Sequence, residues 1–193
     1  MIYLASASPR RKELLQQIGV EFEQISACVD ETPLPGEAPL EYVRRLAQAK
    51  AQAGLESLSG MAAAPVLGSD TTVVLAGKIL GKPENQQHAI DMLLALSNQT
   101  HQVITAVALA SSAETTVTHA ITEVTFGAIS EQEALTYWNT TEPKDKAGAY
   151  GIQGLGAVFV KRIEGSYSAV VGLPLYETRQ LLKQTNVAVW QNG

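Results

Sequence analysis

The sequence predicts an α/β fold with a mixed sheet. Short apolar segments typical of buried strands alternate along the chain with longer segments in which apolar residues recur at helical spacing. Two strand-like segments, at 103–110 and 115–126, follow each other directly, which favours a mixed rather than a purely parallel sheet. The 193 residues contain no repeat and no linker long enough to divide them. We therefore expect one domain, residues 1–193.

The first half of the chain alternates strand and helix signals. Pro9 is suited to the first position of a helix, Ser8 can cap that helix, and Gly19 ends it. A proline-rich and acidic stretch is typical of a loop, and a β-branched run is typical of a central strand. The expected elements are a strand at 2–5, a helix from Pro9, a weak strand at 20–25, a loop at 28–39, a helix at 40–58 and a strand at 66–75.

The second half contains the strand pair and a glycine-rich loop. Ser130 and Glu133 have the spacing of a capping box, which predicts the start of a helix that ends near Asn139. The other expected elements are a helix at 84–96, the strands at 103–110 and 115–126, the loop at 148–156, strands at 158–163 and 169–171, and a helix at 174–183.

Charge and cysteine content exclude several classes of protein. A net charge of -5 lacks the basic excess needed to bind a long phosphate backbone, so no polymeric nucleic acid partner is expected. Cys28 is the only cysteine, so neither an internal disulfide nor a cysteine zinc cluster can form, and a reducing cytoplasm fits. The sequence shows neither an export signal nor a membrane span, and no membrane partner is expected.

Residues 6–11, Ser-Ala-Ser-Pro-Arg-Arg, form the first candidate site. Arg10 and Arg11 fall in the first turn of a predicted helix, where the helix dipole disfavours cations. A phosphate held by the helix N-terminus, the Ser8 hydroxyl and a guanidinium would offset that cost. The alternative is a capped surface helix whose arginines face water.

Asp70 is an ionisable residue in the middle of an otherwise apolar strand. Burying its carboxylate without a partner would cost several kcal/mol, so a metal ion, a lysine or solvent must compensate the charge. Each of these is a feature of active sites. The alternative is a carboxylate that caps a turn or bonds to a neighbouring loop.

Three other charged residues are candidates for the same site. Lys50 continues the apolar stripe of its helix, so its ammonium can meet Asp70 or a phosphate, or snorkel to water. Glu31 lies in the acidic loop and, together with Asp70, would be enough to hold a hard cation such as magnesium. Lys82, before Pro83, is by itself typical of a solvated turn.

Glycines are frequent in residues 145–154, Asp-Lys-Ala-Gly-Ala-Tyr-Gly-Ile-Gln-Gly. They allow backbone to approach a ligand closely, and the Gln153 amide can pair with a base edge through both a donor and an acceptor. A plain turn is the alternative, because the segment is neither a P-loop nor a dinucleotide fingerprint. The histidines have no metal-ligand spacing and no G-x-S-x-G elbow is present, so triad hydrolysis is not expected.

Five motifs together resemble, in order and spacing, those of the Maf family of nucleotide pyrophosphatases. The resemblance covers nearly the whole chain and implies an α/β fold of the Maf/Ham1 type, with an elongated mixed sheet, a cleft between two lobes and, in most members, a homodimer. The motifs are residues 6–11, 68–71, 81–83, 145–154 and 172–174.

The resemblance also implies an activity and roles for residues. The substrate is a nucleoside triphosphate, which is cut between the α- and β-phosphates. Asp70 accepts a proton from the attacking water, and Glu31 and Asp70 hold magnesium or manganese. The residues implied to bind the triphosphate are Ser8, Arg11, Lys50 and Lys82.

Arg10, Thr71 and Gln153 resemble the dTTP/UTP type within this family. The 7-methyl-GTP type usually has glutamine after the aspartate and glutamate in the late loop, and neither is present. Ala7 departs from the glycine that is frequent in relatives. The family has also been linked to cell-division arrest. The alternatives are therefore a pyrophosphatase for modified pyrimidine nucleotides or 7-methyl-GTP, or a non-catalytic regulator of septation.

Overall fold

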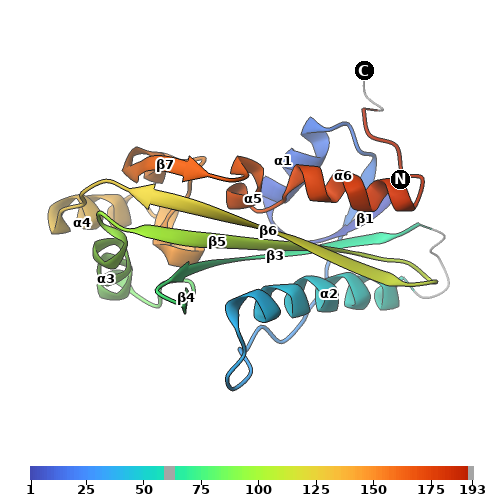
Figure 1. The fold of residues 1–193 in the computed structure, drawn as a ribbon, viewed down its shortest axis with the longest axis horizontal. Helices are drawn as coiled ribbons and strands as arrows, with labels where there is room; N and C mark the ends of the chain where they lie inside the picture. The colour runs from blue at the N-terminus through green and yellow to red at the C-terminus, as the bar shows by residue number, and fades with distance from the viewer. Residues whose placement is uncertain (59–63, 191–193) are drawn as a thin grey trace. The chain divides into compact units, whose positions relative to one another are not determined.

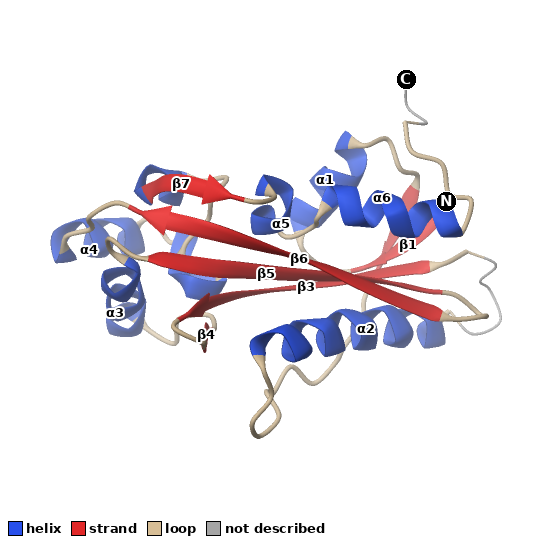
Figure 2. Cartoon of the chain, in the orientation of Figure 1, coloured by secondary structure: helices blue, strands red, loops and turns tan. Residues whose placement is uncertain are grey.

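A single mixed sheet connects most of the chain in a computed structural model, which describes residues 1–58 and 64–190. Within these residues the sheet has seven strands in the order β2-β1-β3-β5-β6-β7, with β4 paired to β3 (Figures 1 and 2). The strands are β1 (Ile2–Ala5), β2 (Phe22–Ile25), β3 (Val66–Leu75), β4 (Lys78–Leu80), β5 (Thr100–Ala110), β6 (Thr115–Phe126) and β7 (Val160–Glu164).

Strand pairing confirms the prediction of a mixed sheet. β1 is parallel to both β2 and β3, with Tyr3 opposite Val66 in the second pair. β4 is antiparallel to β3, and β7 is antiparallel to β6. Parallel strands need a crossover between them, and α1 and α2 lie in the two connections concerned.

The helices alternate with these strands, as the sequence predicts. Among the described residues, no helix is both long enough and apolar enough to cross a membrane. The α-helices are α1 (Pro9–Gln17), α2 (Pro39–Ser57), α3 (Gln86–Leu96), α4 (Glu131–Asn139), α5 (Tyr167–Val171) and α6 (Leu175–Gln184). The short 3-10 helices are η1 (Glu142–Asp145), η2 (Ala147–Ala149) and η3 (Leu155–Phe159).

The chain divides into two compact units. The first unit consists of Met1–Asp70, Thr105–Ala120 and Gly172–Gly193, and the second consists of Thr71–Ile104 and Ile121–Val171. The expectations of one domain and of a cleft between two lobes both stay predictions.

In the first unit, helices cover both faces of the strands. α2 lies along one face, whereas α1 and α6 lie on the other (Figure 1). Buried Ala5, Leu58 and Val66 pack together and join β1, the end of α2 and β3. The apolar stripe of α2 is buried as its periodicity predicts, with Val43 and Leu46 fully inaccessible.

The second unit has an aromatic core that includes a buried histidine. His101, on β5, is within hydrogen-bonding distance of the Tyr150 hydroxyl, at 2.8 Å from Nε2. The rings of Phe126 and Tyr150 meet edge to face with centroids 4.7 Å apart, and Phe159 packs against Phe126 and Tyr137. This core lies next to the glycine-rich segment and fixes Tyr150 within it.

Two local predictions are wrong. The segment 169–171, expected as a strand, belongs to helix α5, because Ser166 starts the helix by accepting the Ala169 N–H at 3.3 Å. Ser8 stands at the N-cap position of α1, but its side chain makes no capping hydrogen bond. The capping box of Ser130 and Glu133 is confirmed at the start of α4.

Candidate active site

The turn between β1 and α1 is organised around the Ser6 hydroxyl. Ser6 is buried, and its Oγ accepts hydrogen bonds from the Ser8 backbone N–H at 3.2 Å and from Arg11 Nη1 at 3.1 Å. Ser6 therefore holds the turn that leads into α1, although it does not cap the helix in place of Ser8. The Ser8 hydroxyl remains outside the capping interaction at the N-terminus of α1.

Arg11 is oriented by the protein rather than extended into water. Besides Ser6, its Nε donates to the Gly172 carbonyl at 2.8 Å, and the same carbonyl accepts from the Ser69 hydroxyl at 3.1 Å. Burial lowers the pKa of Arg11, and Asp70 opposes that effect. A guanidinium fixed at the start of a helix and beside a carboxylate is suited to bind an anion.

Asp70 and Glu31 share one lysine. Lys50 Nζ lies 2.7 Å from Asp70 Oδ1 and 2.6 Å from Glu31 Oε1. Asp70 and Lys50 have side chains only 11% and 12% exposed, whereas that of Glu31 is 52% exposed. The predicted contact between Lys50 and Asp70 is therefore confirmed. Glu31, the most exposed of the three side chains, also contacts Lys50.

Gly68 explains how Lys50 reaches Asp70. A Cβ atom at Gly68 would lie 2.5 Å from the Ala47 carbonyl oxygen and from the Ala51 nitrogen, so only glycine lets the backbone of α2 approach β3 this closely. Residues two apart in a strand share a face, so Asp70 faces α2 as Gly68 does. Ser69 faces the other way, and its hydroxyl donates to the Ala106 carbonyl at 2.9 Å.

Burial and charge oppose each other at Asp70. Burial raises the pKa of the Asp70 carboxyl, whereas Lys50 and Arg11 lower it and Glu31 raises it again; the net direction is upward. A carboxylate with a raised pKa is a stronger proton acceptor than an ordinary aspartate.

The loop that carries Glu31 is attached to α2 by two side chains. Tyr42 donates its hydroxyl to the Glu31 carbonyl at 3.0 Å. Arg45 binds both carboxylate oxygens of Glu37, at 2.6 and 2.7 Å, and the Thr32 carbonyl at 3.2 Å. A bidentate arginine–carboxylate pair fixes orientation as well as distance, so the loop is held against the helix at Glu31 itself and at two residues that follow it.

Three hydroxyl residues have roles that the sequence does not predict: Ser6 and Ser69, which lie within the motifs 6–11 and 68–71, and Tyr42. Tyr42 carried a usable signal, since it lies eight residues before Lys50 and therefore close to the same helical face. Burial, Asp70 and Glu31 all raise the pKa of Tyr42, which keeps its hydroxyl protonated.

The remaining predicted site residues are Arg10, in the first unit, and Thr71, Lys82 and Gln153, in the second. Arg10 is half-buried at the start of α1, and its Nε has no hydrogen-bond partner within the described residues. Thr71 follows Asp70 in β3 and begins the second unit, which also contains Lys82 and Gln153, both exposed. Within that unit, the Gly148 N–H donates to the Gly81 carbonyl at 3.0 Å and so links the glycine-rich loop to the turn of Lys82.

Glu31 and Asp70 form an oxygen donor set suited to a hard divalent cation. Magnesium needs only one or two protein carboxylates, because water and substrate phosphates complete its shell. Both carboxylates contact the same ammonium, so they are close enough to serve one cation. Across residues 1–58 and 64–190, no group of three or more His, Cys, Asp or Glu side chains is arranged to hold a metal by itself.

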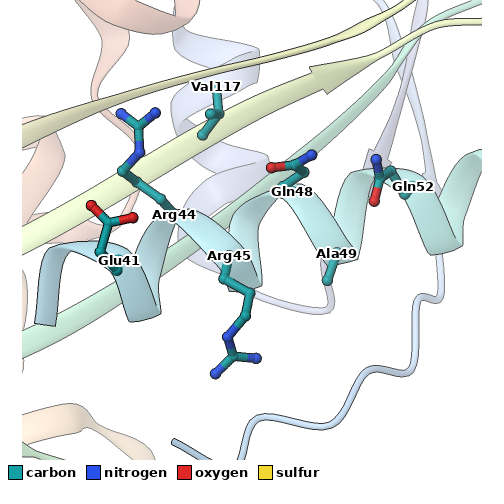
Figure 3. Close-up of a pocket in the computed structure, with 7 residues that line it drawn as sticks. All are labelled: Glu41, Arg44, Arg45, Gln48, Ala49, Gln52 and Val117. Atoms are coloured by element: carbon teal, nitrogen blue, oxygen red, sulfur yellow. The ribbon is translucent and has the colours of Figure 1, made fainter. Parts of the chain in front are cut away.

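A polar hollow of about 420 Å³ lies beside α2 and β6 (Figure 3), and helical periodicity places Lys50 on another face of the helix. Its lining residues on the helix recur at intervals of three and four, as expected for one helical face. They are Glu41, Arg44, Arg45, Gln48, Ala49 and Gln52, with Val117 from β6. The hollow therefore lies apart from the group around Asp70.

Comparison with known proteins identifies the family of the chain. Residues 1–185 match the family model described as Maf-like protein. A dTTP/UTP pyrophosphatase of Saccharophagus degradans is 55% identical over 192 residues, which are 99% of this chain and 91% of the relative. A dTTP/UTP pyrophosphatase of Pseudoalteromonas translucida is 56% identical over 182 residues, 94% of this chain and 95% of the relative. A protein of the same name from Nitrosospira multiformis is 52% identical over 200 residues, 98% of this chain and 97% of the relative. The chain belongs to the Maf family.

Proposed function

We propose that this chain is a pyrophosphatase that hydrolyses dTTP and UTP to the nucleoside monophosphate and pyrophosphate. The observation that carries the proposal is the shared contact of Lys50 with Asp70 and Glu31. Relatives that align over nearly their full length and are named dTTP/UTP pyrophosphatase support the substrate.

Asp70 is the general base in the proposed mechanism. Its carboxylate accepts a proton from a water molecule as the water oxygen bonds to the α-phosphorus. The bond between the α-phosphorus and the oxygen that bridges to the β-phosphate breaks, and that oxygen leaves with the pyrophosphate. The raised pKa of Asp70 supports this role, because it increases the affinity of the carboxylate for the proton.

Cationic side chains stabilise the charge that develops on the departing pyrophosphate. Arg11 is pre-oriented by Ser6 and Gly172, so little conformational freedom is lost when it binds a phosphate. Ser8 and the N-terminus of α1 add hydrogen-bond donors. Lys50 and Lys82 complete the proposed set of phosphate ligands.

A magnesium or manganese ion is the proposed cofactor, and Glu31 and Asp70 would hold it. When bound, the ion withdraws negative charge from the phosphate oxygens and makes the phosphorus easier to attack. Lys50 shares its one positive charge between the two carboxylates, and it would bind the triphosphate more readily if a divalent ion took over part of that role.

Arg10, Thr71 and Gln153 are the proposed determinants of the pyrimidine base. The amide of Gln153 can donate to one carbonyl of uracil or thymine and accept from the ring N–H. Gln153 is exposed, as a residue that binds a ligand must be before the ligand arrives.

The proposal extends to compartment and assembly. Cys28 is the only cysteine and is exposed as a free thiol, which supports a reducing cytoplasm. A homodimer is proposed on the family resemblance, and light scattering of the purified protein tests it.

A substrate panel tests the proposed function. Turnover of dTTP, UTP, 7-methyl-GTP and the common nucleotides is measured by pyrophosphate release, with magnesium and with EDTA. We expect the highest kcat/KM for dTTP and UTP, pyrophosphate as the product, and no turnover in EDTA. Preference for 7-methyl-GTP, or turnover without a metal, would contradict the proposal.

A further inference from the structure

Glu142 has an unusual concentration of hydrogen bonds for a carboxylate beside a glycine-rich loop. Its Oε2 accepts the Leu155 backbone N–H at 2.8 Å, and its Oε1 accepts the Gly156 N–H at 3.0 Å. The Tyr137 hydroxyl donates to Oε1 at 2.7 Å. One side chain at the start of η1 thereby holds backbone that is 13 and 14 residues further along the chain.

Tyr137 extends this contact to the other end of the loop. Its hydroxyl, which donates to Glu142, also accepts the Gly151 N–H at 3.0 Å. The segment 151–156 is thus held at both ends by one connected pair of side chains, and exposed Gln153 lies between the two ends. The packing is close, since a Cβ atom at Gly154 would clash with the Glu142 carboxylate.

The donors and acceptors in this pair have fixed directions. Burial acts to raise the pKa of Glu142, but the hydrogen bonds from Tyr137, Gly156 and Leu155 outweigh it, and the net direction is downward. Burial and the hydrogen bond to Glu142 both raise the pKa of Tyr137. At neutral pH Glu142 is therefore a carboxylate that only accepts, and Tyr137 is a neutral hydroxyl that donates to it.

We infer that Glu142, acting with Tyr137, is a positioning residue for pyrimidine selection. It holds the segment 151–156 so that the amide of Gln153 meets the base edge in one orientation. The inference rests on the proposed function, because it assigns base recognition to Gln153. Neutral glutamine cannot replace Glu142, since its NH₂ group would face a backbone N–H where an acceptor is required.

The experiment uses two variants and a matched control in the full chain. Glu142→Gln keeps the size of the side chain and loses an acceptor, and Tyr137→Phe removes only the hydroxyl. Glu131→Gln makes the same charge change at an exposed position in the first turn of α4. Amide hydrogen exchange measures the loop directly, and kcat/KM for dTTP and dCTP measures base selection.

We expect Glu142→Gln to speed amide exchange by about tenfold or more at Leu155 or Gly156, whichever N–H faces the glutamine NH₂ group, since this is the size expected when a hydrogen bond to a charged group is lost. Tyr137→Phe should do the same at Gly151. In both variants the preference for dTTP over dCTP should fall toward that of Gln153→Ala, chiefly through a higher KM for dTTP. Glu131→Gln should leave exchange and preference unchanged.

Two results would overturn the inference, and they are distinguishable. If Gln153→Ala loses base preference but Glu142→Gln and Tyr137→Phe keep it, Gln153 reads the base without this support. If Gln153→Ala itself keeps base preference, base recognition in the proposed function is wrong and the positioning role is wrong with it. If Glu142→Gln does not fold, Tyr137→Phe alone still tests the inference.

Discussion

Lys50 controls the charge state of Asp70. Burial pushes the pKa of Asp70 upward, and Lys50 is the strongest of the groups that hold it down. An ammonium 2.7 Å from the carboxylate stabilises its ionised form, and the small exposure of both side chains limits screening by water. The proton affinity of Asp70 therefore depends on burial and, among its charged neighbours, chiefly on Lys50.

We predict that Lys50→Met raises the pKa of Asp70 further in the metal-free protein, because the main stabilising charge is lost while burial remains. NMR titration of the Asp70 carboxyl carbon measures the shift. Lys12→Met, a change of an exposed lysine on α1, is the control and should leave the titration unchanged. An unchanged Asp70 titration in Lys50→Met would contradict the electrostatic account.

The charged residues of the site could be predicted individually, whereas their hydroxyl partners could not. Asp70 interrupts an apolar strand and Lys50 continues an apolar stripe, and both are costly placements that require a partner. Ser6 and Ser69 carry no such signal, because serine is common at turns and its burial depends on contacts far along the chain. Ser69, for example, bonds to Gly172, 103 positions away.

The contact between α2 and β3 depends on Gly68. Gly68→Ala should lower the free energy of unfolding by about 1–3 kcal/mol, the usual cost of overpacking, because backbone atoms of α2 must move to admit the methyl group. The same shift should weaken turnover by moving Lys50 away from Asp70. Denaturant unfolding and steady-state kinetics measure the two effects.

Gly81→Ala is the control for the unfolding measurement. Among the described residues, no atom lies within 4 Å of a Cβ built at Gly81, so its added methyl group should have little effect on stability. Equal stability losses in the two variants would show that close approach at Gly68 is not the cause.

The loop of Glu31 depends on the ion pair between Arg45 and Glu37. The hydrogen bonds from Arg45 lower the pKa of Glu37 from 4.5 to about 2. Because the folded pKa lies below the ordinary value, the pair contributes its stabilisation above about pH 4.5 and loses it as the pH falls to about 2. The Arg45 side chain is 32% exposed, so water screens the pair and its contribution to overall stability is small.

We predict that Arg45→Met returns the pKa of Glu37 toward 4.5 and raises the metal concentration needed for half-maximal turnover. The second effect follows because Glu31 loses the support of its loop. NMR titration and metal-dependent kinetics measure these changes. If the pKa of Glu37 returns toward 4.5 but the metal requirement does not change, the ion pair does not position Glu31.

Most helices and strands were predictable because their periodicity is strong, as in α2 and β3. α5 was not, because a five-residue segment with two valines fits a strand as well as a helix. Its conformation is decided by Ser166, whose backbone carbonyl and hydroxyl accept the Val170 and Ala169 N–H groups. The sequence alone does not show whether such a serine will start a helix or precede a strand.

Acid stability of the molecule should depend on His101. Burial lowers the pKa of this side chain from 6.5 to about 4, so the folded protein holds it neutral. The unfolded chain takes up the proton first, and stability therefore falls as the pH drops from about 6.5 to about 4, by roughly 3 kcal/mol in all.

We predict that His101→Gln is less stable at neutral pH but loses less stability across that range. Denaturant unfolding at several pH values measures the slope. An unchanged slope in His101→Gln would mean that other groups cause the acid sensitivity.

The class of the fold was predictable, but the order of its strands was not. The sequence favours a mixed sheet because two strands follow each other directly. It contains no local signal that β1 pairs with both β2 and β3, since these pairings join segments separated by whole helices. The family resemblance, carried by five motifs in register, implied the Maf/Ham1 type of fold but not these pairings.

The proposed chemistry depends on Asp70 more than on any other residue. Asp70→Asn keeps the shape of the side chain and its bond to Lys50, while removing the proton acceptor. Its unfolding temperature should stay close to that of the parent protein, because Lys50 keeps Glu31 as a charged partner.

Pyrophosphate release from dTTP with magnesium, compared between the parent protein and Asp70→Asn, tests the account most directly. We predict dTMP and pyrophosphate from the parent protein and a loss of kcat of about 10²–10⁴-fold in the folded variant, the usual contribution of a general base. Turnover by Asp70→Asn within a few-fold of the parent protein would contradict the account.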